Sequence, residues 1–106
     1  MGEKTYNKLV RDKIPDVLTE HGVLGDFEEL TDEQFRLALL DKLVEEAKEL
    51  RESDGDLGER ADVAEVLKSL DEVCGFTPEK VEDARNEKLS DRGGFDKKLY
   101  LKTTTE

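Results

Sequence analysis

The sequence contains no tryptophan and few other aromatic residues, which limits the core that it can build. Aromatic residues make up 6% of the 106 residues. A chain of this length is expected to form one domain with a modest core, so we predict a single domain over residues 1–106. Because helical pairs of this size often complete their core by association, the composition favours a homo-oligomer, either a homodimer or a homotetramer.

Only one cysteine, Cys74, is present, which excludes an internal disulfide and suits a reducing compartment. The periodicity of its neighbours places Cys74 on the apolar face of a helix, so we interpret it as a core residue rather than a nucleophile. No hydrophobic stretch is long enough to span a membrane, and no signal peptide is visible. We therefore expect a cytoplasmic protein.

Basic residues are scarce relative to acidic ones. The chain has 28 acidic and 17 basic residues and a formal net charge of −11. This imbalance argues against a surface for a nucleic-acid polymer or an anionic membrane. Any chemistry on phosphate groups must therefore use a metal ion and a few well-placed cations.

Capping residues and glycines predict where the first two helices begin and end. Pro15 favours the start of a short helix, and Gly22 favours its end. Thr31 and Gln34 form a capping box, which predicts a second helix that runs to about Ser53.

Two further helices are expected after a turn at residues 54–56. The third covers residues 57–74, with Gly75 just past its end. Thr77 and Pro78 provide an N-cap and a first helical residue for a fourth helix, which should end near Asp91.

The segment after these helices is short and mixed in composition. Residues 95–102 can form a strand or an extended segment. The predicted fold is therefore all-α, a helical bundle of about four helices with a short extended C-terminal segment, completed by oligomerisation.

Two clusters of carboxylates lie on the second and third predicted helices. The first reads Glu45-Glu46-x-x-Glu49, and the second reads Glu59-x-x-Asp62. Hard divalent cations bind to several oxygen ligands at once, and antiparallel neighbouring helices can supply such a set.

Helical periodicity orients some of these acids toward apolar neighbours. Glu46 lies beside the apolar stripe of its helix, and Glu59 lies within that of the next. Glu49 lies further round, Asp62 stands at the edge, and Glu45 points nearly away. The stripes are Leu39, Leu43, Ala47 and Leu50, and Val63, Val66, Leu67, Leu70 and Cys74.

A carboxylate among apolar neighbours is usually paired, protonated or bound to a metal. Convergence of several such carboxylates favours a metal site. The alternative is that these acids form a solvated face, with Glu59 in the first helical turn because acids there complement the helix dipole.

Cations gather in two segments of this acidic chain. Lys8 and Arg11 lie within residues 7–13, and Lys88 and Arg92 are four residues apart before two glycines. Lysine and arginine on one helix face can bind a polyphosphate, and glycines let backbone N–H groups approach it. Bases in a last helical turn and a glycine stop also have a purely structural explanation.

Taken in order along the chain, these motifs resemble the all-α nucleoside triphosphate pyrophosphohydrolase superfamily. More narrowly, they are similar to its short MazG-like members, which are often labelled phosphoribosyl-ATP pyrophosphohydrolase-like. The resemblance covers residues 7–95, although the nine-residue gap between the acidic motifs is shorter than in larger relatives. The motifs are Asn7-Lys8-Leu9-Val10-Arg11-Asp12-Lys13-Ile14-Pro15, Glu45-Glu46-x-x-Glu49, Glu59-x-x-Asp62 and Lys88-x-x-x-Arg92-Gly93-Gly94-Phe95.

The resemblance implies a set of metal ligands for Mg²⁺, with Mn²⁺ as the alternative ion. These ligands are Glu46, Glu49, Glu59 and Asp62, with Glu45 as an additional fifth candidate. Either Glu46 or Glu49 is implied as the catalytic residue that orients the attacking water.

Substrate contacts are implied as well. Lys88 and Arg92 would bind the phosphates, and Lys8 and Arg11 would form a second wall or pair with Asp12.

The implied reaction is hydrolysis between the α and β phosphates of a nucleoside triphosphate or of phosphoribosyl-ATP. It yields a monophosphate and pyrophosphate, in the manner of enzymes that clear unwanted nucleotides. One alternative is a catalytically weak regulatory protein of the same fold that binds nucleotide and metal. Another is a helical interaction module with an acidic surface.

Overall fold

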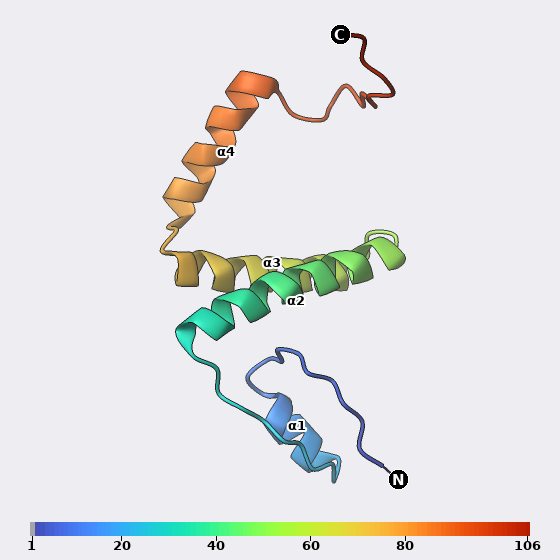
Figure 1. Cartoon of the computed structure of the whole chain (residues 1–106), viewed down its shortest axis with the longest axis vertical. Helices are drawn as coiled ribbons and strands as arrows, with labels where there is room; N and C mark the ends of the chain where they lie inside the picture. The colour runs from blue at the N-terminus through green and yellow to red at the C-terminus, as the bar shows by residue number, and fades with distance from the viewer. Residues whose placement is uncertain (1) are drawn as a thin grey trace. The chain divides into compact units, whose positions relative to one another are not determined.

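The computed structural model describes residues 2–106, which contain four helices and no strand (Figure 1). The prediction of an all-α chain with four helices is confirmed, and residues 95–102 do not form a strand. The helices are α1 (Ile14–Glu20), α2 (Asp32–Glu52), α3 (Leu57–Cys74) and α4 (Pro78–Arg92).

Side-chain caps fix where the longer helices begin. At α2 the capping box is complete: the Thr31 hydroxyl accepts a hydrogen bond from the Gln34 backbone N–H at 3.2 Å, and the Gln34 side chain accepts one from the Thr31 N–H at 3.0 Å. Asp56 caps α3 by accepting a bond from the Glu59 N–H at 3.3 Å, and Thr77 caps α4. Each such cap stabilises a helix by about 1 kcal/mol.

A tight turn joins α2 to α3. Asp54 and Gly55 both adopt left-handed backbone conformations there, with φ values of 57° and 89°. Glycine is suited to this conformation because it has no Cβ atom. The turn lets α2 and α3 pack against each other along their length as an antiparallel hairpin (Figure 1).

The core of the described chain lies between these two helices. Leu39 from α2 and Val66 and Leu70 from α3 are the buried apolar residues. Leu9 and Phe35 are among the partly buried residues that pack against them. The helical periodicity therefore identified the correct inner face on both helices.

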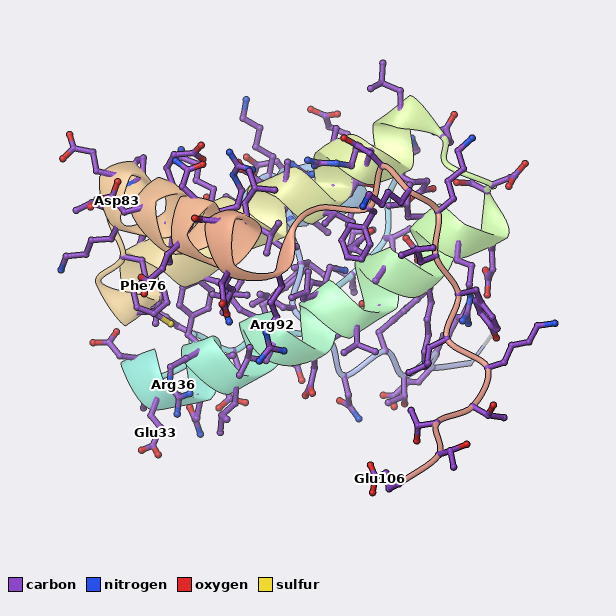
Figure 2. The ribbon with its side chains drawn as sticks, turned by 90° about the horizontal axis from the view of Figure 1, so that it is seen from above. Glu33, Arg36, Phe76, Asp83, Arg92 and Glu106 are labelled. Atoms are coloured by element: carbon purple, nitrogen blue, oxygen red, sulfur yellow. The ribbon has the colours of Figure 1, made fainter. Side chains whose placement is uncertain are left out.

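The outer face of α2 carries both charged and apolar side chains. Glu33 and Arg36, near the start of this helix, point away from α3 (Figure 2).

Three members of the predicted stripes are not buried. Ala47 and Leu67 are exposed. Cys74 is exposed too, so the interpretation of Cys74 as a core residue is wrong. Val73, one residue earlier, packs against the core at this level. Cys74 is the last residue of α3, and the left-handed Gly75 ends the helix directly after it.

The chain divides into two compact units, Met1–Gly75 and Phe76–Glu106. The first contains α1, α2 and α3, and the second contains α4 and the C-terminal segment. The single domain over residues 1–106 stays a prediction. Among residues 2–106, no helix combines the length and the apolar character that crossing a membrane requires.

Candidate metal centre

Three glutamates converge beside the turn of the α2–α3 hairpin. Glu46 and Glu49 lie one helical turn apart near the end of α2, and Glu59 lies in the first turn of α3. One carboxylate oxygen from each residue lies within 4.8 Å of the other two. The short turn produces this convergence, because it places the end of one helix beside the start of the next. These are three of the four residues predicted as metal ligands.

Two of these carboxylates have oxygens that are buried without a partner. Glu46 is only 7% exposed. Its Oε2 atom accepts no hydrogen bond, and the same holds for Oε2 of Glu59. Burying such an oxygen without a donor is costly, and a metal ion removes the cost by coordinating it. The residues present therefore fit a hard divalent cation, which prefers carboxylate oxygens.

The carboxylates also destabilise one another in their ionised forms. Burial raises the pKa of Glu46, and the neighbouring Glu49 carboxylate raises it further. Loss of solvation raises the pKa of Glu59 too, helped by the negative charges of Asp62 and Glu46. A bound cation would reverse this effect by favouring the charged forms.

Lys42 is the one cation of α2 in contact with this cluster. Its Nζ atom lies 3.3 Å from Oε1 of Glu46 and 3.1 Å from Oε2 of Glu45. The side chain is only 16% exposed. Burial opposes its charge, but the two carboxylates outweigh this and raise the pKa of Lys42. The sequence prediction missed Lys42, although its spacing of three and four residues from the two acids is typical of helical ion pairs.

Asp62 does not belong to the group of three. It lies one turn after Glu59 on α3, and its Oδ1 atom accepts a hydrogen bond of 2.7 Å from Nη2 of Arg11. Arg11 was expected to pair with Asp12 if it did not bind substrate. It pairs instead with Asp62, a predicted metal ligand.

Lys8 makes the corresponding contact with α2. Its Nζ atom donates a 3.1 Å hydrogen bond to Oε1 of Glu45, which also explains why Glu45 can point away from the core yet be partly covered. A cavity of about 250 Å³ lies between this N-terminal segment and α2, and both Lys8 and Lys42 line it.

The remaining predicted phosphate-binding residues belong to the second unit. Lys88 and Arg92 lie in the last turns of α4, and Nε of Arg92 is 3.6 Å from the Asp91 carboxylate. Gly93 ends the helix with a positive φ of 80°, which glycine adopts readily. The roles of Lys88 and Arg92 in binding phosphate stay predictions.

No protein-family model, curated protein or solved structure matches the chain. The structure shows an all-α protein with four helices, in which three glutamates form a cluster able to hold a metal ion. A function must therefore be inferred from these side chains.

Replacing Glu46 with glutamine should raise the unfolding temperature of the metal-free protein at neutral pH. Because the pKa of Glu46 is raised, its contribution to stability is fully present below its unfolded-state pKa and is lost as pH rises through its folded-state pKa. Glutamine cannot ionise, so the advantage of Glu46→Gln should shrink toward about pH 4. Thermal unfolding in EDTA across this pH range measures the difference.

Asp41→Asn is the control for that series, because Asp41 is exposed in the middle of the same helix, away from its ends. Its effect should be small at every pH. A stabilisation by Glu46→Gln that does not change with pH would contradict the electrostatic explanation.

Divalent metal should stabilise the protein through the three glutamates. Mn²⁺ at 100 times its dissociation constant should increase the free energy of unfolding by about 2.7 kcal/mol. Glu59→Gln, which keeps the shape but removes the charge, should lose most of this gain in a thermal-shift titration. Glu65→Gln, an exposed position on the same helix, should retain it. Equal gains in all three proteins would refute the metal centre.

Proposed function

We propose that the chain is a Mg²⁺-dependent nucleotide pyrophosphohydrolase of the MazG-like kind that its motifs resemble. It would cleave a nucleoside triphosphate, or phosphoribosyl-ATP, between the α and β phosphates and release a monophosphate and pyrophosphate. The observation that carries this proposal is the convergence of Glu46, Glu49 and Glu59 with two buried, unpartnered carboxylate oxygens. An acidic surface alone does not account for buried carboxylates, because solvated acids stay exposed.

The three glutamates would hold the metal ion, with Mg²⁺ the proposed ion and Mn²⁺ an alternative. A bound divalent cation neutralises charge on phosphate oxygens and lowers the pKa of a coordinated water. The chain must also supply a group that takes the proton of the attacking water.

Glu49 suits the role of general base better than Glu46. Lys42 lies 3.3 Å from the carboxylate of Glu46, which holds that carboxylate in place. Glu46 is also buried, whereas Glu49 is half-exposed and therefore accessible to water. A general base must be within hydrogen-bonding reach of the water that it activates.

Phosphate recognition would fall to the cations that flank the centre. Lys8 and Arg11 already lie beside it, in ion pairs with Glu45 and Asp62. We propose that Lys88 and Arg92 of α4 also bind phosphate, in keeping with their spacing of four residues. In a chain with a net charge of −11, these few cations would have to offset repulsion between the protein and a polyphosphate.

Pyrophosphate release tests this function directly. A panel of standard and modified nucleoside triphosphates plus phosphoribosyl-ATP should yield pyrophosphate in Mg²⁺ and none in EDTA. Loss of a general base typically lowers turnover by about 10²-fold to 10⁴-fold. Glu49→Gln should therefore lower turnover by at least about 10²-fold. Glu65→Gln should behave as wild type.

If the folded protein binds Mg²⁺ and nucleotide but releases no pyrophosphate, its function is regulatory and not enzymatic. A protein that binds neither would leave only the interaction module.

We also propose that the first unit associates with a second copy of itself. Leu37, Leu40 and Val44 form a second row on α2 and are 50%, 42% and 54% exposed. The buried apolar core of the described chain consists of only Leu39, Val66 and Leu70, which is small for a stable domain. A twofold contact would bury the same row on both copies at once.

Light scattering coupled to gel filtration checks the association. The wild-type protein should have at least twice the mass of one chain, and Leu40→Glu should shift it toward the monomer, because a charge in an apolar interface is costly. Leu24→Glu is the control, since Leu24 is fully exposed in a loop. A monomeric wild-type protein would exclude this interface.

A further inference from the structure

The N-terminal segment is joined to both helices of the hairpin by ion pairs. Lys8 contacts Glu45 on α2, and Arg11 contacts Asp62 on α3, with N–O distances of 3.1 Å and 2.7 Å. Between them, Leu9 packs against the apolar core. The segment is therefore held to the hairpin at three points, and its two cations pair with carboxylates outside the three-glutamate cluster.

The two ion pairs differ in how many partners the carboxylate has. Glu45 already has a second partner in Lys42, so the loss of Lys8 would leave it paired. Asp62 has Arg11 as its hydrogen-bond partner, and it lies three residues after Glu59. Residues at this spacing occupy the same side of a helix. Asp62 is thus the acidic side chain best placed to join the glutamates if its present partner leaves.

Arg11 is suited to change partners. Its side chain is 59% exposed and that of Asp62 is 38% exposed, and exposed ion pairs contribute little to stability. A guanidinium group presents parallel N–H donors that match two phosphate oxygens as well as they match a carboxylate. A substrate phosphate arriving at the centre would therefore compete directly with Asp62 for Arg11.

We propose that Arg11 is a positioning residue that holds Asp62 away from the metal until a phosphate group displaces it. In the resting protein the metal centre would consist of Glu46, Glu49 and Glu59. When substrate phosphate binds Arg11, Asp62 becomes the fourth carboxylate of the centre. This inference rests on the proposed function, and it adds that metal and phosphate strengthen each other's binding, as linkage requires.

A double-mutant cycle on metal affinity tests the inference in the full chain without substrate. Free Mn²⁺, measured by electron paramagnetic resonance, gives the dissociation constant for the wild type, Arg11→Met, Asp62→Asn and the double variant. Arg11→Met should tighten Mn²⁺ binding by between about 5-fold and 150-fold, the usual range of coupling between sites. Asp62→Asn should change the resting affinity much less than Arg11→Met does, and the double variant should match Asp62→Asn.

Two controls separate release of Asp62 from simple loss of positive charge. Lys8→Met removes the same charge from the same segment and should change the affinity much less than Arg11→Met. Arg11→Lys, which keeps an ammonium near Asp62, should restore most of the wild-type affinity. Should Arg11→Met fail to fold, Arg11→Gln removes the charge and keeps polar character.

The possible outcomes distinguish this inference from the function on which it rests. Arg11→Met could tighten Mn²⁺ binding equally in the wild-type and the Asp62→Asn backgrounds. That result would show an effect of charge alone and would overturn the role of Arg11. Weaker Mn²⁺ binding in Asp62→Asn alone would mean that Asp62 is a ligand already in the resting state. An absence of Mn²⁺ binding in every protein would instead overturn the metal centre and the proposed function with it.

Discussion

The burial of the Glu46 carboxylate is the constraint on which the rest of this hairpin depends. The residue is 7% exposed and sits on the same helix face as Leu39, so packing α2 against α3 removes it from water. Removing a charge from water is expensive unless it is compensated. The contact with Lys42 compensates part of the cost, and the unpartnered oxygens of Glu46 and Glu59 represent the part that remains.

This constraint couples stability to chemistry. A hairpin selected only for stability would place an apolar side chain at position 46, because the position is buried and the core is small. The buried carboxylate of Glu46 instead lowers the stability of the hairpin, and the packing of Leu39, Val66 and Leu70 must compensate for this loss. Local departures from good packing of this kind are characteristic of functional sites. The buried acid therefore carries more functional information than the many exposed acids of the chain.

Local sequence patterns predicted the parts of this arrangement that are themselves local. The capping box at Thr31 and the inward position of Glu46 follow from spacings of three and four residues, which helical geometry fixes. The same rule misplaced Cys74, because periodicity gives the face of a residue but does not show whether that face is still covered at the last residue of a helix.

The contacts of the N-terminal segment could not be predicted in this way. Lys8 and Glu45 are 37 residues apart, and Arg11 and Asp62 are 51 residues apart. No helical or strand period relates residues at such separations, so only the folded chain pairs them. The motif resemblance grouped these residues by function but did not specify their partners.

The balance of charge explains why a divalent cation, and not another lysine, suits this centre. Lys42 reaches Glu45 and Glu46 because it is three and four residues away on the same helix, but that geometry places its ammonium group on one side of the cluster. Glu59 approaches from α3, and its unpartnered oxygen lies beyond this contact. A small ion can occupy the space among all three carboxylates, which a tethered side chain cannot do. Because a divalent ion also carries two charges, it can compensate several carboxylates at one point.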